Sequence, residues 1–204
     1  MLSVRITPMR VFMSTCGIIY VWCLPLLALC GFSQPGSHSI SAFIANPPAT
    51  GAMAAVSFMP LTLMWEFQDS IIETHLEKNK IKKKLYRTLS IFQFFYGCFL
   101  TCTETYAPGW LHATTVVLFG SSFAYHGIMT INSIQSTNVY ANSVLFVGIL
   151  SFLSLLFVKG MWFWAMECLG FTSMLLYTPM QWYTFIEPHE CNVKLTHHSL
   201  TNDE

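Results

Sequence analysis

The stretch ETYAPGWLHATTVVLFGSSFAYHGIMT, residues 104–130, decides how this chain folds. Beyond its first residue it has no acid, lysine or arginine, and a helix that crosses the hydrocarbon core of a bilayer needs about 20 predominantly apolar residues. Pro108 breaks the chain at its start, and Trp110 suits the membrane–water interface. The stretch therefore predicts a membrane-spanning helix that carries two titratable rings, His112 and His126.

The composition of the whole chain agrees with this interpretation. Hydrophobic residues make up 53% of its 204 residues, charged residues only 10%, and the mean hydropathy is +0.50, whereas soluble domains carry about 25% charged residues. The apolar residues come in blocks of membrane-spanning length rather than alternating with polar ones. Membrane lipids are the expected partners, a membrane protein is a further candidate, and no nucleic acid is expected.

Six segments have the character of membrane-spanning helices. The fold class predicted is therefore all-α: a polytopic bundle of six transmembrane helices within residues 1–186, followed by a tail over 187–204. The N-terminal segment also resembles a signal peptide, but its apolar run exceeds the 7–15 residues typical of such peptides, which favours a retained span. The six spans are expected at about 11–32, 50–67, 88–105, 110–131, 142–158 and 161–183.

The distribution of basic residues predicts the orientation. Two precede the first span, six lie between the second and third, one follows the sixth, and only Lys159 falls on the other side. Cytosolic loops are enriched in lysine and arginine, so both termini and the loop between spans two and three are expected in the cytosol. The loop is either an orientation signal alone or also a contact for anionic lipid headgroups, at about 1 kcal/mol per basic residue. Its basic residues are Lys78, Lys80, Lys82, Lys83, Lys84 and Arg87.

Acidic and imidazole side chains mark a candidate site at the lumenal side. Glu104 is expected at the end of the third span and His112 in the first turn of the fourth. Glu167 lies about six residues, or ~9 Å, into the sixth span. Because an acid is expensive in lipid, Glu167 is expected to face the bundle interior and to have a partner, for which His112 is nearest in depth.

Two interpretations of that pair stay open. An imidazole and a carboxylate can bind a lipid headgroup or do acid–base chemistry, or they can hydrogen-bond to each other and hold two helices together. His126, deeper in the same helix, is expected to be a structural fastener. The first lumenal loop adds candidate ligand-binding residues, which are His38, Ser39, Ser41 and Asn46.

Neither a metal nor a cofactor is expected. His112 and His126 are fourteen residues apart, as in helices that hold two haems, but the other histidines lie in predicted loops or the tail and offer no second axial ligand. The seven cysteines form no CxxC pair, so a zinc ribbon is not expected. Cys191, just past the last span, is a candidate for palmitoylation.

Two motifs carry a family resemblance: SISAFIANPPATGA (Ser39–Ala52) and APGWLHATTVVLFG (Ala107–Gly120). Together with the basic loop, they resemble the family that groups DRAM autophagy modulators, FRAG-type GPI-anchor remodelling factors and Sfk-type regulators. His112 takes the place of that family's helix-four histidine, but AFIAN stands where the family usually has an acidic residue and a glycine. The resemblance implies six helices and a location in the lysosome, Golgi or plasma membrane, and the ER is a further endomembrane location that we consider.

Three functions are compatible with these features. The first is a regulatory or lipid-handling membrane protein without enzymatic activity, which the resemblance favours. The second is a lipid-remodelling acyltransferase or hydrolase that uses His112 with Glu104 or Glu167. The third is a small proton-coupled transporter.

Overall fold

The computed structural model describes residues 7–33, 38–75, 79–103 and 105–200, and every regular element within them is a helix. The all-α fold class is thereby confirmed. The helices are α1 (Thr7–Leu29), α2 (Ile40–Phe43), α3 (Pro47–His75), α4 (Asn79–Thr101), α5 (Gly109–Ile134), α6 (Val139–Ser154) and α7 (Met161–Leu200).

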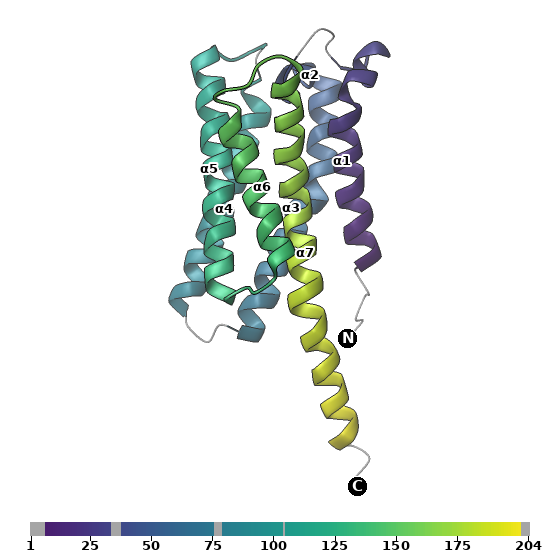
Figure 1. Cartoon of the computed structure of the whole chain (residues 1–204), viewed down its shortest axis with the longest axis vertical. Helices are drawn as coiled ribbons and strands as arrows, with labels where there is room; N and C mark the ends of the chain where they lie inside the picture. Colours follow the sequence, from purple (N-terminus) through teal and green to yellow (C-terminus); the bar gives the residue numbers. More distant parts are fainter. Residues whose placement is uncertain (1–6, 34–37, 76–78, 104, 201–204) are drawn as a thin grey trace.

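The six long helices run up and down in one bundle, and the short α2 lies across one end of it (Figure 1). We call that end the α2 end. The opposite end holds the start of α1, the end of α3 and the start of α4, and α7 extends beyond the other helices there (Figure 1). The six predicted segments each coincide with one long helix, although α4 begins nine residues earlier than predicted, at Asn79, and α7 continues through the predicted tail to Leu200.

Hydropathy singles out only one helix of the described chain. Residues Val11–Leu29 of α1 are long and apolar enough to cross a membrane, whereas α6 is apolar but has only 16 residues. The other long helices carry histidine, glutamine, serine and threonine among their apolar residues, which lowers their average. Several of these polar side chains are buried between helices, among them Gln68, Thr88, His126 and Gln181.

Glycines lie at close contacts between helices. A Cβ atom on Gly127 of α5 would lie 2.6 Å from Leu145 Cδ1 of α6, and one on Gly148 would lie 2.8 Å from Ser173 Cβ of α7. Small residues of this kind let helix backbones approach closely, as membrane helices commonly do. Gly148 of α6, and Gly170 of α7, which lies against Phe152 of α6, are at the contact between α6 and α7 and favour the close packing of these two helices.

Aromatic rings fill the centre of the bundle. Phe119 of α5 lies between the rings of Phe92 and Phe99 of α4 and Phe171 of α7, with centroid separations of 5.8, 5.4 and 5.6 Å. These rings are almost completely buried. Phe119 and Phe171 also contact Phe152 of α6, which lines the candidate site described below.

Polar side chains add hydrogen bonds between the helices. His126 Nδ1 lies 2.9 Å from Thr88 Oγ1, which joins α5 to α4 and confirms that His126 is a structural fastener. Tyr96 donates to Ser57 Oγ at 2.7 Å, and Tyr177 donates to the carbonyl oxygen of Gly127 at 3.1 Å. Each bond satisfies a group that would otherwise be costly to bury.

Candidate functional site

The short helix α2 is held at the end of the bundle by an acid from α7. Ser39 caps α2, because its hydroxyl accepts from the Ala42 N–H at 3.1 Å. The N–H of Ile40, the first residue of α2, donates to Glu167 Oε2 at 2.5 Å. Ile40 is 0% exposed and Glu167 is 3% exposed, so this bond lies inside the protein. The prediction that Glu167 faces the interior and has a partner is confirmed, and the backbone of Ile40 is a partner that the sequence did not indicate.

His112 is fixed in a similar way, by a backbone carbonyl. It lies in the first turn of α5, and its Nδ1 lies 2.5 Å from the carbonyl oxygen of Cys102, just past the end of α4. A carbonyl oxygen only accepts, so Nδ1 carries the hydrogen, and Nε2 is the acceptor of the neutral ring. The bond ties α5 to α4 and sets which ring nitrogen can act as a base.

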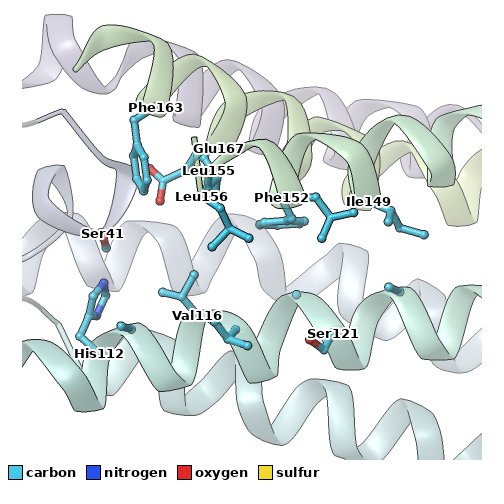
Figure 2. A pocket seen from close by; sticks show the side chains of 15 residues that line it. Ser41, His112, Val116, Ser121, Ile149, Phe152, Leu155, Leu156, Phe163 and Glu167 are labelled. Carbon is cyan, nitrogen blue, oxygen red and sulfur yellow. The ribbon is translucent and has the colours of Figure 1, made fainter. Parts of the chain in front are cut away.

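Ser41, His112 and Glu167 line one cavity of about 470 Å³ between α5, α6 and α7. Figure 2 shows these three side chains at one end of the cavity, each coming from a different helix. The rest of the lining is almost wholly apolar and extends away from them. The cavity therefore has a polar end, formed by Ser41, His112 and Glu167, and an apolar shaft, formed by residues that include Val116, Gly120, Ala124, Ile149 and Phe152.

The shaft has an opening on the side of the bundle. Three of its lining residues are well exposed on the outer surface: Val117 of α5 at 60%, and Leu153 and Leu156 at 54% and 75%. Because α5 carries the first and the segment at the end of α6 carries the other two, the opening lies between these segments. A ligand can thus enter from the side.

Phe152 forms part of the inner wall of the shaft. A Cβ on Gly120 of α5 would lie 3.5 Å from its ring, and one on Gly170 of α7 would lie 3.1 Å from it. Its ring also meets Phe119 edge-on at 5.9 Å. The ring of Phe152 is therefore packed between α5 and α7, and these contacts fix this part of the cavity wall.

The four candidate residues of the first loop have different positions and partners in the structure. Only Ser41 lines the cavity. Ser39 caps α2, His38 is exposed, and Asn46 Nδ2 donates to the carbonyl oxygen of Phe32 at 2.9 Å, which fastens the loop to the end of α1.

Other predicted site residues lie elsewhere or outside the described part of the chain. Glu104 and Lys78 fall outside the described residues, as do the side chains of Lys80, Lys82 and Cys191. Lys83, Lys84 and Arg87 are exposed near the start of α4, at the end of the bundle opposite α2.

The contribution of α6 was missed from the sequence. Ile149 and Phe152 form one wall of the shaft, yet nothing in their segment distinguishes them from other apolar residues of a span. The one usable signal was glycine: Gly120 and Gly170 interrupt apolar runs, and both lie against Phe152. Isolated glycines within helices often mark a close packing contact.

No family model, curated protein or solved structure matches this chain. The resemblance to DRAM, FRAG and Sfk-type proteins therefore stays a prediction. What the fold and site define is a class: an all-helical bundle with a lateral, largely apolar cavity that ends in a serine, a histidine and a buried acid.

Proposed function

We propose that this chain is a multi-pass membrane protein that binds a membrane lipid in the cavity between α5, α6 and α7, in a regulatory or lipid-handling role. The observation that carries the proposal is the division of that cavity into a polar end and an apolar shaft with a lateral opening. An amphiphile has the same division, with a polar headgroup and an apolar chain. A lateral opening suits a ligand that arrives from within a bilayer.

The outer surface of the bundle supports a membrane location. Large apolar side chains are exposed along its helices, while serine, threonine, glutamine, histidine and glutamate are buried between them. Soluble monomers rarely expose contiguous apolar patches larger than a few hundred Å², so such a surface fits lipid better than water. Exposed examples from different helices are Phe12, Leu26, Phe58, Phe94, Val117, Phe146 and Leu150.

Charge and aromatic residues support the orientation with both termini in the cytosol. The exposed Lys83, Lys84 and Arg87 lie at the end opposite α2, and cytosolic loops are the ones enriched in such residues. At the α2 end, Trp110 at the start of α5 and Trp162 at the start of α7 are exposed. Tryptophan favours membrane–water interfaces, so the polar end of the cavity lies at the depth of the lumenal headgroups and ester bonds.

The length of the cavity, from its polar end to the far end of the shaft, fits one lipid chain. From His112 to Ala124 the lining follows α5 for twelve residues, which is ~18 Å at 1.5 Å per residue. One leaflet of a ~30 Å hydrocarbon core is ~15 Å deep. A lipid of the lumenal leaflet can therefore place one acyl chain in the shaft and its headgroup at the polar end.

Lipid retention tests this proposal. The full chain, purified in mild detergent, is expected to carry a co-purifying lipid that native mass spectrometry detects. Val116→Trp fills the shaft and should abolish retention. Leu118→Trp is the matched control, because Leu118 is an exposed residue of α5 that does not line the cavity. Loss of lipid from both variants, or from neither, would contradict the proposed site.

Membrane topology is tested separately, in sealed vesicles of known orientation. In a background without native cysteines, Lys84→Cys and Tyr106→Cys place single thiols at opposite ends of the bundle, since both side chains are exposed. An impermeant maleimide should label Lys84→Cys from the cytosolic side and Tyr106→Cys only after permeabilisation. Labelling of both thiols from one side would refute the six-span topology.

A further inference from the structure

We infer that the polar end of the cavity is an acyl-transfer site in which Ser41 is the nucleophile, His112 is the general base, and an ester-linked acyl lipid is the substrate. The inference rests on the proposed lipid site and adds a reaction to it. Ser41 has no assigned role in the proposed binding beyond lining the cavity.

The first support is the placement of the two groups. Ser41 comes from α2 and His112 from α5, and both line the same cavity. Figure 2 shows the two side chains directed toward each other from opposite walls, with the apolar shaft leading away from them. A nucleophile and its base must share such a site, together with space for the reacting carbonyl.

The second support is the tautomer of His112. Its Nδ1 is held against the carbonyl oxygen of Cys102, so Nε2 is the basic nitrogen of the neutral ring. Serine hydrolases use the same arrangement, in which a fixed acceptor holds Nδ1–H and Nε2 takes the proton of the serine. Here a backbone carbonyl takes the place of the carboxylate that usually orients the ring.

The third support is the positioning of Ser41. Ile40 immediately precedes it, and the Ile40 N–H is bound by Glu167 Oε2. The Ser41 hydroxyl itself lies 3.2 Å from Ser39 Oγ, which also accepts from the Ala42 N–H. Glu167 is therefore a positioning residue, which holds α2 and thereby the nucleophile against the cavity.

The shape and charge of the cavity identify the substrate class. An acyl chain in the shaft brings its carbonyl carbon to the polar end, where Ser41 and His112 lie. Among the described residues of the lining there is no lysine or arginine to bind a phosphate. These features favour an acyl ester whose chain, rather than an anionic headgroup, is recognised.

The reaction balances without a cofactor. Ser41 Oγ attacks the ester carbonyl while His112 Nε2 takes the hydroxyl proton, and the tetrahedral intermediate then breaks the bond to the alcohol. The departing alkoxide takes the proton from His112, which leaves the acyl group on Ser41. A second alcohol, or water, then gives its proton to Nε2 and attacks the carbonyl of the acyl-serine. The second tetrahedral intermediate breaks its bond to Ser41 Oγ, which takes the proton back from Nε2, so that the new ester or the fatty acid is released and both side chains are restored.

A long-chain alkyl fluorophosphonate tests the inference on the purified full chain. Such a probe forms an Oγ–P bond with an activated serine and loses fluoride. We expect one adduct, on Ser41, located by peptide mass spectrometry. The rate of labelling should fall at least ~100-fold in His112→Asn, since general-base catalysis contributes about 10²–10⁴-fold. Asparagine places an amide N–H near the position of Nδ1, which preserves the donor to Cys102 while removing Nε2.

Ser121 is a second serine of the cavity lining and so the alternative site of labelling. Ser90→Ala provides the control, because Ser90 is an exposed serine of α4 that does not line the cavity. Its labelling should equal that of the wild type. The inference is overturned if the folded wild type retains lipid but takes no label, if the label falls on Ser121, or if His112→Asn is labelled as fast as the wild type. If the wild type retains lipid but takes no label, the proposed lipid binding still holds and only the acyl-transfer reaction is refuted. Labelling of Ser41 in a protein that retains no lipid would support the reactive serine and contradict the lipid proposal instead.

Discussion

Removing the Glu167 carboxylate should release α2 from the bundle and lower the stability of the protein measurably. The Ile40 N–H donates to Glu167 Oε2, and both residues are buried. A buried donor left without its acceptor bears the full cost of desolvation, about 1–3 kcal/mol. Glu167→Ala should therefore lower the free energy of unfolding by about 1–3 kcal/mol, whereas Glu167→Gln, which keeps an oxygen that can accept from the Ile40 N–H, should lower it by less.

The assay is thermal unfolding of the detergent-purified chain, followed by tryptophan fluorescence. For a chain of about this size, 1 kcal/mol corresponds to roughly 2–4 °C in the thermal midpoint, so Glu167→Ala should lower the midpoint by about 2–12 °C. Glu66→Ala is the control, since Glu66 is an exposed acid on α3. A midpoint for Glu167→Ala equal to that of Glu66→Ala would show that α2 does not depend on this bond. Equal losses for the alanine and glutamine variants would also refute the reasoning, because the acceptor would then be irrelevant.

Two further predictions concern helix packing. Gly127→Ala should lower the free energy of unfolding by about 1–3 kcal/mol, as overpacking does, because the new Cβ would lie 2.6 Å from Cδ1 of the fully buried Leu145. Gly97→Ala is its control: nothing lies within 4 Å of the new atom, so the thermal midpoint should stay the same or rise. Thr88→Val removes the hydroxyl that bonds His126. If the bundle spans a membrane as proposed, a double-mutant cycle with His126→Ala should give a coupling of about 0.6 kcal/mol and at most about 1.7, the range for interhelical hydrogen bonds of membrane proteins. Equal thermal midpoints for Gly127→Ala and Gly97→Ala, or a coupling of zero between Thr88 and His126, would contradict these accounts.

The parts of the fold that follow from the length of apolar runs could be predicted from the sequence. Each of the six predicted segments coincides with a long helix, because blocks of apolar residues define where helices can be buried in lipid or in one another. The interior position of Glu167 and the role of His126 also followed, because a polar group within an apolar segment must find a partner. Both predictions follow from the free-energy cost of burying a polar side chain, and that cost can be judged from the type of residue alone.

The docking of α2 could not be predicted in the same way. A helix of four residues shows no periodicity, and its segment reads as a short apolar piece of a loop. Its place is set by a bond from Ile40 N–H to a side chain 127 residues away, and a backbone N–H leaves no mark on the sequence. The same holds for the Cys102 carbonyl that fixes His112.

The use of backbone partners has a consequence for how this site varies among sequences. The bonds that orient Glu167 and His112 do not depend on the side chains of Ile40 or Cys102, so Cys102→Ser should leave the His112 bond in place. The chemistry at the polar end, in contrast, depends on the side chains of Ser41, His112 and Glu167 themselves. A site specified by three side chains and two backbone atoms leaves little sequence for a comparison to detect.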